Sequence, residues 1–131
     1  MSVELAAARV VMAATIEVFE PRDLGPKSWG RELLIAHTET YIGKVLWMRA
    51  GASGPLQYHE RKDETFFLLS GEAIVTGVDG AALLGYPMSP GMAFHIPPGV
   101  VHRVTAVSDC VFVEASTPVF DDRVNVEARF R

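Results

Sequence analysis

Four polar side chains in the middle of the chain have the types and the spacing of metal ligands. Gln57 and His59 lie two residues apart, so their side chains would leave the same face of a strand. Glu64 opens the next apolar run after a short polar turn, and His102 follows a Pro-Pro-Gly turn further along the chain. An amide oxygen, a carboxylate and two imidazoles that meet at one point suit a divalent transition metal with one or two open positions.

Short strands are the elements that must bring these ligands together. From Thr15 onward, apolar runs alternate with turn residues roughly every 8–12 positions, which is typical of an antiparallel sandwich or barrel. We predict strands over residues 15–19, 32–37, 41–48, 56–59, 65–69, 73–78, 81–84, 92–96, 100–107 and 110–114. The pair Asp79-Gly80 predicts a hairpin. The prolines that fall in the predicted gaps are Pro87, Pro90, Pro97, Pro98 and Pro118. The fold class is therefore predicted to be all-β.

The composition indicates a single intracellular domain. A length of 131 residues suits one domain, and the lone Cys110 cannot form an internal disulfide, so we expect a reducing, cytoplasmic setting. The formal net charge of −4 and the lack of a Lys/Arg run argue against nucleic acid and membranes as partners. Residues 1–14 are expected to form an arm and not a signal peptide, because Glu4 and Arg9 interrupt the apolar stretch. Residues 15–131 are expected to form the domain.

Two motifs in the chain resemble those of the cupin family. The first, G-x5-Q-x-H-x4-E-x6-G over residues 51–71, has the family's spacing, with Gln in the place of its first His. The second, G-x5-P-x-G-x2-H over residues 91–102, lacks only the family's final Asn, because Ala106 stands there. The resemblance covers roughly residues 15–120. It implies a single-domain cupin, which is a jelly-roll barrel also described as a double-stranded β-helix.

The glutamine resembles that of one branch of the family. Residues 56–59, Leu-Gln-Tyr-His, are similar to the cupin domain of mannose-6-phosphate isomerases, in which a Gln-His-Glu-His set binds zinc. The similarity extends to residues 27–32, 43–46 and 116–122 and ends after Asp122, where the isomerases' usual Arg and carboxy-terminal motif are missing. It implies a divalent metal ion, with zinc favoured over iron, manganese or nickel. The ligands that it implies are Gln57, His59, Glu64 and His102.

Other residues are candidates for substrate binding. Lys44 lies in an apolar strand, so it should be paired or face a cavity. Lys62 is expected at the barrel mouth, where it either contacts a phosphate or carboxylate or is a solvated turn residue. Trp29 either stacks on a sugar face or packs at a barrel end, and Gln57 either coordinates the metal or only hydrogen-bonds inside the barrel. The residues expected to be structural are His37, His95 and Cys110.

Two functions of different classes fit these residues. The first is a metal-dependent isomerase of a sugar or sugar phosphate, with Lys27, Lys44 and Lys62 available to a phosphate and no residue assigned as the base. The second is a non-catalytic module that binds a carbohydrate or a small metabolite. An iron(II) dioxygenase is less favoured, because the family's dioxygenases usually present three histidines. We also expect a homodimer, because the apolar segment 10–16 predicts an edge strand that a second copy would cover.

Overall fold

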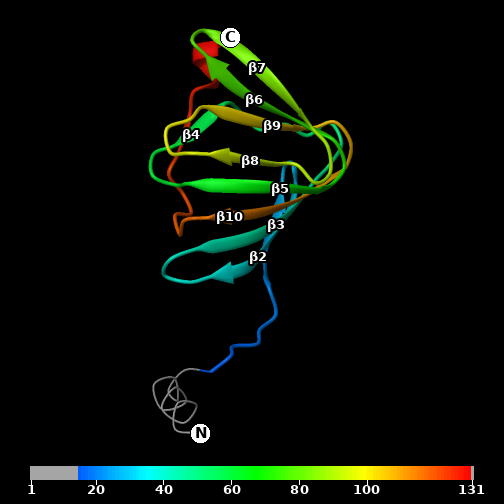
Figure 1. Ribbon diagram of the computed structural model, residues 1–131, viewed down its shortest axis with the longest axis vertical. Helices are drawn as coiled ribbons and strands as arrows, with labels where there is room; N and C mark the ends of the chain where they lie inside the picture. Colours follow the sequence, from blue (N-terminus) through cyan, green and yellow to red (C-terminus); the bar gives the residue numbers. More distant parts are fainter. Residues whose placement is uncertain (1–14, 131) are drawn as a thin grey trace, which may run out of the picture.

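Two antiparallel sheets pack face to face and form a jelly-roll barrel (Figure 1). The computed structural model describes residues 15–130. The six-stranded sheet has the order β1 (Arg22–Lys27), β2 (Gly30–His37), β3 (Ile42–Met48), β10 (Cys110–Ser116), β5 (Glu64–Ser70) and β8 (Ala93–Ile96). The five-stranded sheet has the order β11 (Arg123–Asn125), β4 (Gln57–His59), β9 (His102–Ala106), β6 (Ala73–Asp79) and β7 (Ala82–Met88). A short 3-10 helix, η1 (Glu127–Phe130), follows β11. The predicted all-β fold class is confirmed.

The interior of the barrel has an apolar end and a charged end. In β10, Phe112 faces inward toward one end, and Glu114 and Ser116 face inward toward the other; all three are buried. The flanking strands place Lys44 of β3 and Glu64 of β5 at the same charged end. The apolar core comprises Met48, Leu68, Ala73, Val75, Met88, Ala106, Cys110 and Phe112. Burial of these side chains stabilises the barrel and leaves its other end for polar groups.

The strand predicted over residues 15–19 is wrong. The chain there has no strand partner, and Ile16 and Val18 are 92% and 93% exposed. The first strand is instead β1, which contains Gly25-Pro26, a pair that is typical of a turn and not of a strand. This strand tolerates the pair because it lies at the edge of its sheet, where a missing N–H is harmless, and because its register shifts between Asp23 and Pro26.

Other predictions have mixed outcomes. Pro87 lies inside β7 and not in a gap, since β7 is also an edge strand. The short strand β11 is not among the predicted strands. The hairpin at Asp79-Gly80 is confirmed: it joins β6 to β7, with Gly80 at a φ of +62°. The predicted arm over residues 1–14 lies outside the described residues. Between residues 15 and 130, no helix is long and apolar enough to cross a membrane.

Gly71 closes the turn between β5 and β6 and leaves no room for a side chain. Its φ is +89°, and a Cβ would lie 2.2 Å from the backbone oxygen of Asp109. Gly51 has a similar φ of +82°, but nothing lies within 4 Å of its Cβ position. We expect Gly71→Ala to lower the free energy of unfolding by about 3 kcal/mol and Gly51→Ala by about 1 kcal/mol. Chemical denaturation measures both losses, and equal losses would contradict the steric explanation.

Candidate metal centre

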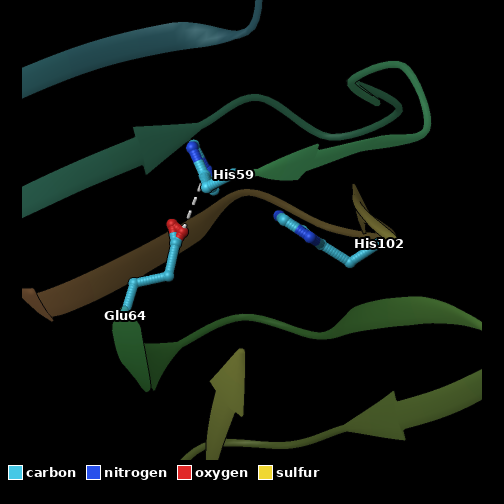
Figure 2. A group of neighbouring side chains, drawn as sticks. All are labelled: His59, Glu64 and His102. Carbon is cyan, nitrogen blue, oxygen red and sulfur yellow. Dashed lines mark ion pairs between the residues drawn. The ribbon is translucent and has the colours of Figure 1, made fainter. Parts of the chain in front are cut away.

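Three buried side chains converge at the charged end of the barrel. His59 ends β4, Glu64 begins β5 and His102 begins β9 (Figure 2). Each offers one ligand atom, and these atoms all lie within 4.8 Å of one another. The three residues are 5%, 3% and 6% exposed. The fold thus brings together three of the four predicted ligands, and their cluster could hold a divalent metal ion.

Hydrogen bonds on the far side of each imidazole fix its orientation. Nδ1 of His59 lies 2.9 Å from Oδ1 of Asp122, and Nδ1 of His102 lies 2.9 Å from the backbone oxygen of Val100. When Nδ1 of each neutral ring carries the proton, it donates a hydrogen bond to that oxygen, so Nε2 keeps a lone pair. Metal-binding histidines are typically held in this way. The two rings are therefore prepared to act as Nε2 ligands.

One carboxylate oxygen of Glu64 lies in an environment that a bound cation would explain. Its Oε2 is buried and has no hydrogen-bond partner among residues 15–130. The same oxygen lies 3.3 Å from Nε2 of His59. When the proton is on Nδ1, a nitrogen lone pair faces an oxygen lone pair across this distance, which is costly unless a positive charge lies between them. Two imidazole nitrogens and a carboxylate oxygen are common ligands of zinc and related ions, so the residues present fit a metal.

The pKa values of these groups show that their charges are coupled. Burial by itself lowers the pKa of His59, but the carboxylates of Glu64 and Asp122 outweigh burial and raise it. Burial by itself raises the pKa of Glu64, but the adjacent His59 and Lys62 hold its pKa below the usual value. Burial also lowers the pKa of His102. The carboxylates that favour a proton on His59 would equally favour a metal, so proton and metal compete for this cluster.

Residues 45–116 match a family model described as a cupin domain. The match covers more than half of the chain and includes all three clustered residues. The chain belongs to the cupin family. The family predicted from the two motifs is therefore confirmed, and so is the single jelly-roll fold that it implies. A comparison with curated proteins finds no match, and the closer resemblance to mannose-6-phosphate isomerases stays a prediction.

Several solved structures share the fold of this cupin. CapF, a capsular polysaccharide assembling protein from Staphylococcus aureus, has a TM-score of 0.73 at 18% identity, over 84% of this chain and 32% of CapF. KdgF from Halomonas sp. has a TM-score of 0.66 at 25% identity, over 79% of this chain and 90% of KdgF. Bacillus subtilis oxalate decarboxylase, which has Mn(II) centres, has a TM-score of 0.70 at 18% identity, over 86% of this chain and 33% of the decarboxylase. This cupin thus spans about a third of CapF and of the decarboxylase.

A cavity of about 340 Å³ opens beside the cluster. Gln57 lines this cavity and is the register partner of His102 in the β4–β9 pair, so its side chain leaves the sheet on the same side as the histidine. The fourth predicted ligand is therefore on the correct face, and its coordination of a metal stays a prediction. Trp29, a predicted substrate-binding residue, lines the same cavity.

Two buried lysines line the cavity, and each is paired with carboxylates. Lys44 of β3 contacts Glu32 of β2, which agrees with the prediction that this lysine is paired. Lys62 lies 3.2 Å from Glu114 and 3.7 Å from Glu64. Burial by itself lowers the pKa of Lys62, but these two carboxylates raise it, so the lysine stays charged. The alternative that Lys62 is a solvated turn residue is wrong: the side chain is 5% exposed, because its carboxylate partners hold it inside.

Three carboxylates of the site are absent from the predicted residues. Glu32 and Glu114 are buried partners of the lysines, and Asp122 is the partner of His59. Glu114 did carry a signal, because it stands at an inward position of an apolar strand, two residues after Phe112. Asp122 lies in the segment 116–122 that resembles the isomerases, but that pattern gave it no role, since only the fold brings it to a histidine 63 residues away.

Asp122 is expected to matter for metal affinity although it is not a ligand. One of its oxygens holds His59, and the other accepts hydrogen bonds from the backbone N–H groups of Arg61 and Lys62. Asp122→Asn removes the charge and one acceptor, so we expect metal affinity to fall about 10–100-fold. The exposed neighbour Asp121, changed to Asn, is the matched control and should keep the native affinity. Titration against a chelating indicator measures both; equal affinities would show that the orientation of His59 does not depend on Asp122.

Proposed function

We propose that this cupin binds one divalent metal ion and that the ion is zinc. The ligands in this proposal are Gln57, His59, Glu64 and His102. The observation that carries it is the buried Oε2 of Glu64, which lacks a hydrogen-bond partner within residues 15–130 and lies beside Nε2 of His59. The cavity beside the cluster gives a small molecule access to the open positions that such an ion would keep.

The ligand in this proposal is a small anionic carbohydrate, such as a sugar phosphate. A cavity of about 340 Å³ suits a molecule of that size. Trp29 offers a flat face to a sugar ring, and the ammonium groups of Lys44 and Lys62 keep N–H groups for its hydroxyls. Two more cations line the cavity, Lys27 and Arg123, and neither forms an ion pair within residues 15–130. Their charge favours a phosphate or carboxylate on the ligand.

The reaction in this proposal is the isomerisation of an aldose and a ketose. A divalent ion in the site would supply Lewis-acid polarisation of a substrate oxygen. A base must also move a proton between adjacent carbons. Glu32 and Glu114 are the buried carboxylates of the cavity outside the proposed ligand set, so they are the groups able to take up that proton. Ser116 donates a hydrogen bond of 2.9 Å to Glu114, which fixes the orientation of this carboxylate.

A binding module without catalysis is the second candidate function. Its support is that the buried lysines and glutamates of the cavity are paired with one another, as in a site that recognises hydroxyl groups without reacting with them. The less favoured alternative, an iron(II) dioxygenase, has the support of the cluster itself, because two histidines and one carboxylate also suit iron(II). The identity of the bound metal tests that prediction directly.

Incubation of the zinc-loaded protein with a panel of aldose and ketose phosphates tests the isomerase proposal. Product that forms with one of them, and that is lost after chelation of the metal, would support it. Calorimetry on the same panel separates the two candidates, because tight binding without product would favour the binding module. If no sugar or sugar phosphate binds, both candidates fail.

Arg123→Gln is expected to reduce recognition of the anion and to leave the metal in place. The charged hydrogen bond that it removes is worth about 1.4 kcal/mol, so affinity for a sugar phosphate should fall about tenfold. Affinity for the unphosphorylated sugar should not change. Arg22→Gln is the matched control, because Arg22 is exposed and does not line the cavity. Calorimetry measures both affinities, and an equal loss for the two sugars would contradict a role in recognising the anion.

We propose as well that this cupin is a homodimer. The segment 10–16 that predicts a dimer lies mostly outside the described residues. Support comes instead from an apolar surface on the six-stranded sheet, where Phe67 and Leu69 are 39% and 56% exposed.

Cys110 is 1% exposed, as predicted for a small buried side chain. The cytoplasmic setting stays a prediction.

A further inference from the structure

The inner face of the barrel changes from charged to apolar two residues away from the candidate metal centre. Phe66 follows Glu64 by two residues on β5, and Val104 follows His102 by two residues on β9. Residues two apart on a strand share a face and lie about 7 Å from each other. Each sheet therefore places an apolar side chain directly beside a clustered one, and all four residues line the same cavity.

Six apolar side chains form one side of this cavity, which we call the apolar wall. They come from five strands and are Leu46, Met48, Phe66, Phe94, Val104 and Phe112. Met48 and Phe112 are buried, whereas the other four are only half-buried although they point into the barrel. The exposed surface of these four side chains therefore faces the cavity that they line.

The aromatic rings of the wall hold one another in place. Phe66 and Phe94 stack with their ring centres 5.1 Å apart. Phe112 meets both rings edge-on, at 6.3 and 6.2 Å. Both arrangements are favourable for aromatic pairs. The wall is thus formed without a ligand, so little ordering of side chains accompanies binding.

A hydroxyl group against this wall would lack a good hydrogen-bond partner. Met48 is the one member whose side chain has a heteroatom, and a thioether sulfur is a weak acceptor. The two carboxylates that adjoin the wall in the register, Glu32 and Glu114, are already paired with lysines. Burial of an unpaired hydroxyl is unfavourable, whereas burial of a carbon group is favourable. The wall therefore selects against hydroxyl groups.

We infer that the ligand of this site is amphipathic: a small hydroxy acid whose oxygen atoms reach the clustered residues and whose other end is an apolar carbon group against the wall. A carboxylate and its neighbouring hydroxyl suit the open positions of a divalent ion. This inference rests on the proposed function and narrows its ligand. It favours a deoxygenated sugar acid over a fully hydroxylated sugar.

Calorimetry on the zinc-loaded protein with three hydroxy acids tests this inference. Lactate, 2-hydroxyhexanoate and gluconate share a carboxylate with a hydroxyl on the next carbon. The last two have the same six-carbon skeleton, but gluconate carries four more hydroxyl groups. We expect 2-hydroxyhexanoate to bind about tenfold more tightly than either of the others, because only its carbon chain buries apolar area against the wall without an unpaired hydroxyl.

Val104→Thr tests the wall itself, because it keeps the shape of the side chain and adds a hydroxyl. The preference for 2-hydroxyhexanoate over gluconate should fall about threefold, and in Leu46→Asn, which adds an amide, about tenfold. Val45→Thr is the matched control, since Val45 is also half-buried on a strand but does not line the cavity. Metal content and thermal unfolding of each variant establish that the site and the fold are intact.

The outcomes separate this inference from the proposed function. Equal binding of the two six-carbon acids, or tighter binding of gluconate, would overturn the inference and leave the metal centre standing. A preference that survives both Val104→Thr and Leu46→Asn, or that Val45→Thr reduces equally, would overturn the role of the wall. If none of the three acids binds, the inference fails, and binding of a sugar phosphate would still support the proposed function.

Discussion

The purified wild-type protein should hold close to one metal ion per chain, and the double variant His59→Ala with His102→Ala should hold none. The two imidazoles are the nitrogen ligands of the cluster, and loss of both leaves one carboxylate and one amide. A single carboxylate in a cavity does not retain a transition metal at micromolar concentration. Plasma mass spectrometry of both proteins, before and after reconstitution, measures the difference.

Metal removal should also lower stability, and only in the wild type. An ion that binds the folded state alone stabilises it by about 2.7 kcal/mol at a concentration of 100 times its Kd, and by about 4.1 kcal/mol at 1,000 times. A chelator should therefore lower the Tm of the wild type and leave the Tm of the double variant unchanged.

The chain contains its own control for this experiment. His37 and His95 lie outside the cluster: His37 packs against Phe120, and His95 pairs with Asp63 at the surface. The double variant His37→Ala with His95→Ala removes the same number of imidazoles and should keep the full metal content. A wild type that takes up no metal after reconstitution would refute the metal centre, and so would a His59/His102 variant that still binds it.

The ligand cluster could be predicted from the sequence because its spacing is local. Gln57 and His59 share a face of β4, and Glu64 follows one turn later at the start of β5, so three of the predicted ligands lie close together in the sequence. His102 joins them only through the β4–β9 pair, and here the second motif supplied the missing information. Asp122 belongs to neither motif, and its contact with His59 forms only when β11 pairs with β4. Local pattern does not encode such a contact.

The strand errors have the same origin. Residues 15–19 alternate as a strand does, but an extended segment becomes a strand only if a neighbour offers hydrogen bonds, and no neighbour within residues 15–130 does so. The opposite holds for β1. Its Gly25-Pro26 dipeptide disfavours a central strand, but β1 pairs with β2 at the edge of the sheet, where this dipeptide is tolerated. Whether each of these segments forms a strand therefore depends more on a neighbouring strand that can pair with it than on its own sequence.

Glu114→Leu should destabilise the protein by about 3–5 kcal/mol, because it leaves the buried ammonium of Lys62 without its nearest carboxylate. Lys62 is 5% exposed, and the carboxylate of Glu64, at 3.7 Å, is the partner that remains. In the proposed metal centre the carboxylate of Glu64 is a metal ligand, which weakens its electrostatic interaction with Lys62 further. Chemical denaturation of the metal-free protein measures the loss.

A second substitution should restore most of that stability. Lys62→Met in the Glu114→Leu background replaces the ion pair with apolar side chains of similar volume, and such replacements are often neutral or stabilising. The cycle of both single variants and the double variant therefore isolates the pair, and a strongly favourable coupling energy between the two changes is expected. If Glu114→Leu alone lowers the free energy of unfolding by less than about 1 kcal/mol, Lys62 reaches solvent or another carboxylate in solution. That result would contradict the interpretation that the charged end of the barrel is closed to solvent. If the double variant is as unstable as the single one, Glu114 stabilises the barrel through Ser116, its hydrogen-bond donor at 2.9 Å, and not through the lysine.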